Sequence, residues 1–173
     1  MSERLFIMVE GNDDERFFKK IVVPLFSDIY DKITIWQHAQ KSREAKENFL
    51  SSIKALKADY IYVEDMDEYR NIHTKINMIK NSMDKLQPEN ILIVIKEIEG
   101  WYLAGLDEDS SRKLNLTYLP ETNDIFKEDF NKMIPKKFDS RIDFMQEILK
   151  KFSISKARIK NDSFNYFMET FAT

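Results

Sequence analysis

Short apolar runs that end in acidic residues recur three times in the first hundred positions of the chain. The runs are LFIMVEGNDDERFF from Leu5, YIYVEDMDEY from Tyr60 and ILIVIKEIEGWYL from Ile91. A fourth apolar run, KITIWQ, lacks the acidic end. Continuous apolar and β-branched runs of this length are typical of strands covered on both faces, as in parallel sheets. We therefore expect strands over residues 4–10, 32–37, 59–64 and 91–96.

The segments between these runs carry apolar residues at helical spacing. In the first segment we expect Pro24 to end or kink the helix, because proline cannot continue the backbone hydrogen bonding. The buried stripe of the third segment is expected to be Ile72, Ile76, Ile79, Met83 and Leu86. Strands that alternate with helices favour βαβ units with right-handed crossovers.

Beyond Glu99 only helical spacing remains. A short helix is expected from Trp101, a cap and loop over residues 107–116, and a helix over residues 139–152 with Ser140 and Asp143 as its capping box. The Phe-rich end of the chain predicts a last helix. The expected fold is α/β and Rossmannoid, with about four mainly parallel strands, helices on both faces and a helical C-terminal extension. Its α/β domain should span residues 1–105, and the extension, residues 106–173, should pack on it as a single structural unit.

Composition narrows the classes of function. The chain has 173 residues, a net charge of −3 and no cysteine, so thiol nucleophiles, disulfides and zinc–thiolate sites are excluded. No overall basic field attracts nucleic acid, although the 27 Lys and Arg residues leave room for a local basic patch. No apolar run approaches the roughly 20 residues of a membrane span, and a strand begins almost at once. We expect a soluble cytoplasmic protein with no membrane partner.

Five carboxylates fall at or just after the ends of the predicted strands. They are Glu10, Asp65, Asp67, Glu97 and Glu99. Ligands of open parallel α/β sheets bind outside the carboxyl ends of the strands, so these side chains should meet at one edge. Carboxylates that close together repel one another unless a cation lies among them, and oxygen ligands suit Mg²⁺ or Mn²⁺. The sequence does not choose between Glu97 and Glu99 as the ligand after the fourth strand.

Simpler interpretations compete with this one. Acidic residues after a strand often cap the next helix, and that is the interpretation we prefer for residues 13–15. A calcium loop starting at Asp65 is excluded, because Arg70 stands where the loop needs glycine. Either histidine, His38 or His73, is more readily explained as a hydrogen-bonded or surface residue than as a ligand.

Basic and glycine residues near the acids are candidates for phosphate contact. Gly11 would allow a tight turn and a close approach to phosphate, and Lys96 could reach a phosphate or offset the neighbouring acids. Lys156, Arg158 and Lys160 could form a basic edge for a nucleic-acid backbone, although a solvated face is the interpretation we prefer.

A strand ending in Glu10-Gly11, followed two βα units later by a strand ending in Asp65-Met66-Asp67, resembles the TOPRIM domain of topoisomerases, primases and OLD-family nucleases. The resemblance covers about residues 4–103. It extends loosely to small stand-alone TOPRIM proteins related to OLD nucleases of defence systems. It implies that Glu10 acts near the scissile phosphate and that Asp65 and Asp67 bind Mg²⁺. Asn12 and Asp13 depart from the Lys and Ser or Thr that often follow the glycine.

The resemblance favours a Mg²⁺-dependent phosphodiester hydrolase of the nuclease type, acting on DNA or RNA in defence or DNA repair. Topoisomerase and primase activity are disfavoured, because the chain has neither room for a tyrosine-bearing domain nor zinc-binding cysteines. One alternative is a binding or regulatory module with weak or lost activity that needs a partner protein. Another is a receiver-like phospho-acceptor, although that fold needs an acidic pair where Glu10-Gly11 stands.

Overall fold

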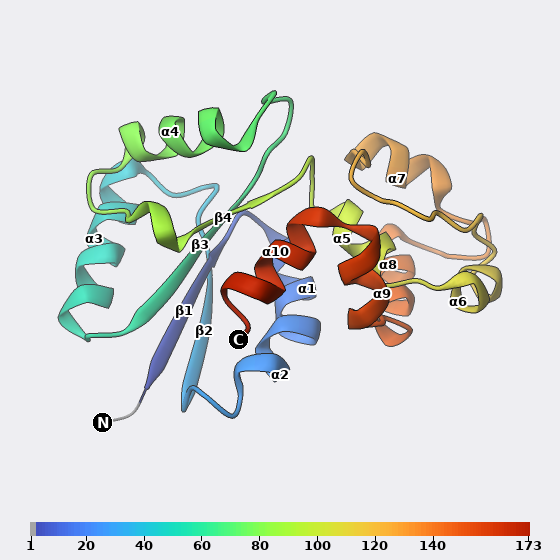
Figure 1. The fold of residues 1–173 in the computed structure, drawn as a ribbon, viewed down its shortest axis with the longest axis horizontal. Helices are drawn as coiled ribbons and strands as arrows, with labels where there is room; N and C mark the ends of the chain where they lie inside the picture. The colour runs from blue at the N-terminus through green and yellow to red at the C-terminus, as the bar shows by residue number, and fades with distance from the viewer. Residues whose placement is uncertain (1–2) are drawn as a thin grey trace. The chain divides into compact units, whose positions relative to one another are not determined.

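A four-stranded sheet with the order β2-β1-β3-β4 forms the first part of the molecule in this computed structural model, which describes residues 3–173 (Figure 1). The strands are β1 (Arg4–Val9), β2 (Lys32–Gln37), β3 (Asp59–Asp65) and β4 (Ile91–Val94). β1 runs parallel to both β2 and β3, with Ile7 opposite Ile35 on one side and Ile61 on the other. The predicted parallel α/β sheet is therefore confirmed.

The described chain divides into two compact units, Met1–Ile93 and Val94–Thr173. The helical segments of the first unit are α1 (Asn12–Phe17), the π-helix η1 (Phe18–Val22), α2 (Val23–Phe26), α3 (Arg43–Ala55), α4 (Ile72–Ser82) and the 3₁₀ turn η2 (Pro88–Asn90). Those of the second are α5 (Glu99–Ala104), α6 (Glu108–Lys113), α7 (Lys127–Met133), α8 (Arg141–Lys150), α9 (Ile154–Lys160) and α10 (Asp162–Thr170). The expectation of a domain boundary near residue 105, with the extension packed on the sheet, stays a prediction.

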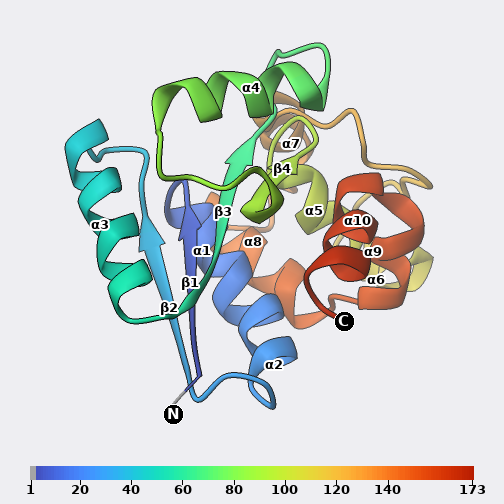
Figure 2. The ribbon, with the colours of Figure 1, turned by 60° about the vertical axis from the view of Figure 1, so that its left-hand side comes forward.

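Helices cover both faces of the sheet in the first unit. On one face, Met8 and Tyr62 of the strands pack in a buried cluster with Leu50 of α3 and Ile79 of α4. Strand residues whose side chains point to the other face, such as Ile7, are also buried. The helices α1 and α2 lie on the side of the sheet opposite α3 (Figure 2). This double cover explains why the strands are apolar throughout rather than alternating.

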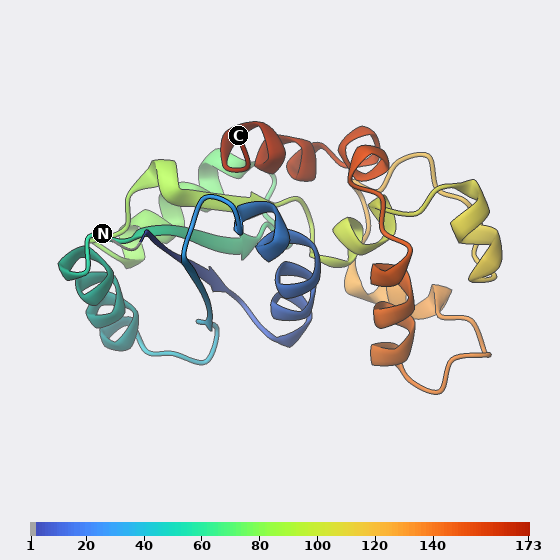
Figure 3. The same cartoon turned by 90° about the horizontal axis from the view of Figure 1, so that it is seen from below.

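Aromatic packing organises the helices of the second unit, drawn from yellow-green to red in Figure 3. The Trp101 ring of α5 meets the Phe164 ring of α10 edge-on, with centroids 5.0 Å apart. Gly105 lies so close to Phe152 that an added Cβ atom would stand 2.1 Å from that ring. No helix in the described part of the chain is both long and apolar enough to cross a bilayer.

Local expectations differ from the structure in several places. Pro24 does not end the helical segment, which continues through α2 to Phe26; the proline follows the π-helix η1 and lies in the first turn of α2. A kink at Pro24 stays a prediction. The segment expected as a cap and loop after Asp107 contains the helix α6. Ile72, expected in the buried stripe of α4, is 40% exposed, whereas Lys75 of the same helix is only 2% exposed.

Candidate metal centre

The end of β3 supplies two of the predicted carboxylates. Asp65 is the last residue of the strand and is buried, and Asp67 follows in the turn to α4. Asp67 has a φ of 52°, in the left-handed region that aspartate tolerates better than most residues. A tight turn, closed by a hydrogen bond from Tyr69 N–H to Met66 O (3.2 Å), holds this conformation. An open depression of about 420 Å³ lies beside it, lined by Asp67, Glu68 and Tyr69.

Glu10 lies directly against the end of β3, as the parallel pairing of β1 and β3 requires. Its carboxylate accepts a hydrogen bond from the backbone N–H of Asp65 (2.8 Å). Burial raises the pKa of Glu10 to about 7, against the lowering effect of that hydrogen bond. The nearby carboxylates of Asp14, Glu64 and Asp67 contribute smaller parts of this rise in the pKa. Such mutual repulsion is relieved when a cation binds among the acids.

The segment around Gly11 combines helix capping with the acidic cluster. Asp14 is buried and accepts a hydrogen bond from Gly11 N–H (3.3 Å), so the expected capping role is present. Asp13 pairs with Arg16, and Glu15 with Lys19. The predicted tight turn at Gly11 is absent: its φ is −150°, and nothing lies within 4 Å of an added Cβ atom. The effect of Asp14 on Glu10 was not predicted from the sequence, where their four-residue spacing is its signal.

The two glutamates after β4 lie in different surroundings within the second unit. Glu97 is partly exposed, and its carboxylate accepts a hydrogen bond from Lys127 N–H. Glu99 is buried in the first turn of α5 and forms an ion pair with Arg141 of α8. Arg141 also donates to Asn131 Oδ1 (2.8 Å). The carboxylate of Glu99 therefore already has a fixed cationic partner.

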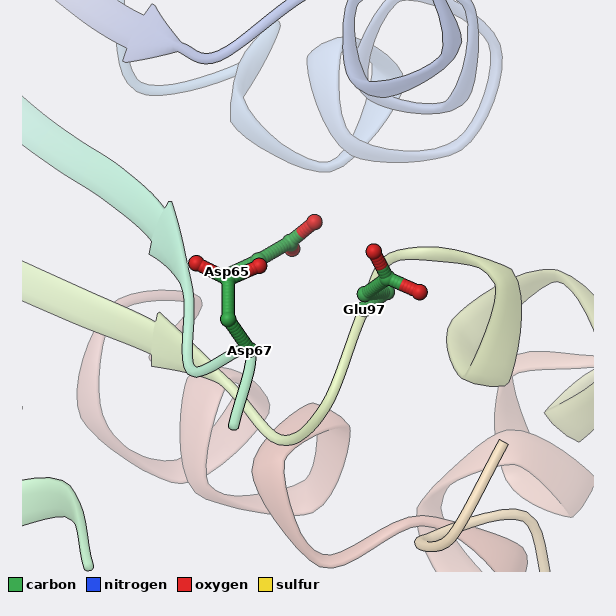
Figure 4. Close-up of side chains that lie close together, drawn as sticks. All are labelled: Asp65, Asp67 and Glu97. Carbon is green, nitrogen blue, oxygen red and sulfur yellow. The ribbon is translucent and has the colours of Figure 1, made fainter. Parts of the chain in front are cut away.

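Figure 4 shows Asp65 and Asp67 on the segment that ends β3, and Glu97 on the segment that follows β4. Asp65 and Asp67, two residues apart at the end of β3 in the first unit, supply carboxylates that could hold a metal ion. Their donors are oxygen atoms alone, which fits a hard divalent cation such as Mg²⁺ or Mn²⁺. Glu10 and Glu99 do not belong to this group.

The remaining candidates lie on separate elements. Lys96 has a φ of 58°, and its ammonium group lies 5.1 Å from the centroid of the Phe126 ring. Lys156 and Arg158 are exposed on α9, and Arg158 donates to Asn165 Oδ1 (2.9 Å). A cavity of about 780 Å³ lies at the amino end of β3, where Asp59 and Tyr60 line it. Asp65 lies at the opposite end of the same strand.

His38 is a structural residue. Its ring stacks on Tyr62, and its Nε2 lies 2.7 Å from Val63 O. Burial lowers the pKa of His38 to about 4, so the ring is neutral at physiological pH. The preference for a hydrogen-bonded histidine over a ligand agrees with these contacts.

A parallel α/β sheet with carboxylates at the carboxyl ends of its strands defines a Rossmann-like protein with a candidate divalent-cation site. No family model and no curated protein matches the sequence. Among solved structures, the chain is similar to the C-terminal region of the Burkholderia pseudomallei OLD protein, with a TM-score of 0.48 and 12% identity over 98% of each chain. The resemblance seen in the sequence also included OLD-family proteins. This likeness concerns the fold, and we base the functional argument on the residues.

Proposed function

We propose that the chain is a divalent-metal-dependent phosphodiester hydrolase of the nuclease type, acting on DNA or RNA. The observation that supports this proposal is the cluster of carboxylates at the carboxyl end of β3, where Glu10 accepts a hydrogen bond from the backbone N–H of Asp65. Asp65 and Asp67 would hold the ion, and Glu97, predicted from its place after the fourth strand, is a proposed further ligand. When bound, Mg²⁺ or Mn²⁺ supplies Lewis acidity and an activated water at neutral pH.

The other groups have proposed roles that follow from their position and charge. Glu10, with a pKa raised to about 7, is suited to take a proton from an attacking water near the scissile phosphate, because a general base works best near the operating pH. Gly11, where the missing side chain leaves open space beside the backbone, and Lys96 are proposed phosphate contacts. Lys156 and Arg158 are proposed contacts to the nucleic-acid backbone. We assign Glu99 a structural role with Arg141 rather than a ligand role.

A cleavage assay tests the proposal. The full chain is incubated with labelled double-stranded DNA, single-stranded DNA and RNA, in Mg²⁺, Mn²⁺ or EDTA. We expect cleavage of at least one substrate with metal and none in EDTA. Asp65→Asn should lower the rate at least about a hundred-fold, since a Lewis-acid metal contributes several kcal/mol to lowering the barrier. Glu68→Gln is the matched control, because it removes one exposed carboxylate from the same turn.

Two results contradict the proposal. Cleavage that persists in EDTA or in Asp65→Asn would show that the acidic residues are not its source. Metal binding without cleavage of any of the three substrates would favour the alternative, a binding or regulatory module that needs a partner protein.

A further inference from the structure

Lys75 is a buried lysine whose charged end faces two acids of the turn after β3. Its side chain is 3% exposed, and its Nζ lies 3.1 Å from Glu64 Oε1 and 3.2 Å from Asp67 Oδ2. The ammonium group also lies 4.8 Å from the centroid of the Tyr69 ring. Burial lowers the pKa of Lys75, but the two carboxylates outweigh this and raise it, so the side chain is charged at neutral pH.

The position of Lys75 in its helix is unfavourable for a cation. Asn71 caps α4, and Lys75 N–H donates to Asn71 O, so the lysine lies at the end of the first helical turn. The positive end of the helix dipole disfavours a cation there, and burial of an ammonium group adds a large desolvation cost. The ion pairs with Glu64 and Asp67 and the contact with the Tyr69 ring offset both effects.

Lys75 also bears on the conformation of a proposed metal ligand. Asp67 has a positive φ, which costs free energy in any residue other than glycine. The contact from Lys75 Nζ holds one carboxylate oxygen, Asp67 Oδ2, toward α4. Asp67 is therefore shared between a fixed lysine and any ion that its other oxygen binds.

We propose that Lys75 is a built-in counter-cation, which neutralises part of the acidic cluster in the metal-free protein and weakens the binding of a divalent ion at Asp65 and Asp67. This inference rests on the proposed metal centre. Lys75 has two opposing effects on a bound ion: it positions Asp67, which favours binding, and it repels the ion. Repulsion between a unit charge and a divalent ion a few ångströms apart outweighs one positioned hydrogen bond, even with strong solvent screening.

The test is calorimetric titration of the full chain with Mn²⁺ and Mg²⁺ at pH 7.5, together with melting temperatures in EDTA and in saturating metal. We expect Lys75→Met to bind the ion roughly ten-fold more tightly than the native protein, because the repelling charge is gone. In EDTA it should melt several degrees lower, and saturating metal should raise its melting temperature more than that of the native protein. Lys54→Met, which removes an exposed lysine of α3, controls for net charge and should leave the affinity unchanged.

Two further variants keep the test decisive. Lys75→Gln keeps most of the length and a hydrogen-bond donor, and it should also bind metal more tightly. Lys75→Arg keeps the charge and should restore the native affinity. Equal or weaker metal binding by both neutral variants overturns the inference, as does a failure of metal to restore folding if both unfold in EDTA.

The inference and the proposed function fail in different ways. If native protein and Lys75→Met both bind no metal, the metal centre itself is wrong and the inference falls with it. If Lys75→Met binds metal more tightly but neither protein cleaves nucleic acid, the hydrolase proposal fails while the role of Lys75 stands.

Discussion

At the scale of single residues, the clearest consequence is the titration of Glu10. Its pKa is about 7 in the folded, metal-free protein against an ordinary value of 4.5, so the folded state holds a proton that the unfolded state has lost. The stability this gives is fully present below pH 4.5 and is lost as the pH rises through 7. Between pH 4.5 and 8 we expect it to fall by about 3 kcal/mol relative to Glu10→Gln, which stays neutral and keeps the oxygen acceptor.

Denaturant unfolding in EDTA at pH 4.5 and pH 8 measures this difference. Because an ionised Glu10 adds a negative charge beside Asp65, the native protein should also bind Mg²⁺ more tightly above pH 7 than below it. A difference between native protein and Glu10→Gln that does not change with pH would show that Glu10 ionises normally.

The two glutamates after β4 should separate into different roles. Glu97→Gln is expected to weaken metal binding at least about ten-fold, as loss of a coordinating group does, with little change in stability. Glu99→Gln should cost about 3 kcal/mol of stability, since it leaves Arg141 without its ion-pair partner, and should leave metal affinity unchanged. Calorimetry and thermal unfolding of both variants check this, and a metal-binding defect in Glu99→Gln alone would reverse the assignment.

The pairing of individual side chains was the feature least predictable from the sequence. Glu10, Asp65 and Asp67 could be predicted as neighbours, because all three follow apolar runs that form strands. The carboxyl ends of parallel strands lie at the same edge of the sheet. Lys75 looks like a surface lysine in a helical run, and its pairing depends on the rotation of α4. The partner of Glu99 lies 42 residues away in α8, a distance over which sequence spacing carries no geometric information.

At the scale of elements, the two glycines next to helices make opposite predictions. Gly105→Ala would drive a Cβ atom into the Phe152 ring, and we expect a loss of roughly 1–3 kcal/mol, as for other overpacked positions. At Gly11 the backbone is extended and an added Cβ atom would point into open space. We therefore expect Gly11→Ala to change the free energy of unfolding by no more than about 0.5 kcal/mol. Thermal unfolding of the two variants compares them directly, and equal losses would contradict the packing around Phe152.

The strands were the most predictable elements. β2 begins and ends as expected, at Lys32 and Gln37, because a β-branched run bounded by polar residues leaves little choice. β4 ends two residues early, at Val94, since Lys96 adopts a positive φ that breaks the strand. Helix faces were less predictable: apolar spacing alone predicted Ile72 to be buried, whereas the interaction with Glu64 and Asp67 draws Lys75 inward instead.

At the scale of the whole molecule, the charge of the chain limits how it can hold a nucleic acid. A net charge of −3 gives no general attraction to a polyanion, so affinity must come from local groups. In our proposal these are the bound ion, Lys96 and the exposed pair Lys156 and Arg158. The metal would therefore contribute to substrate binding as well as to hydrolysis.

Both the proposed hydrolysis and the role of Lys75 depend on a divalent ion at the carboxyl end of β3, which anomalous diffraction from a crystal soaked in Mn²⁺ can detect. We expect an anomalous peak with oxygen ligands from Asp65 and Asp67 at about 2.0–2.6 Å. The peak should be absent from an Asp65→Asn crystal soaked in the same way. A soaked native crystal with no peak at these carboxylates, or with manganese only at other surface acids, would contradict the account.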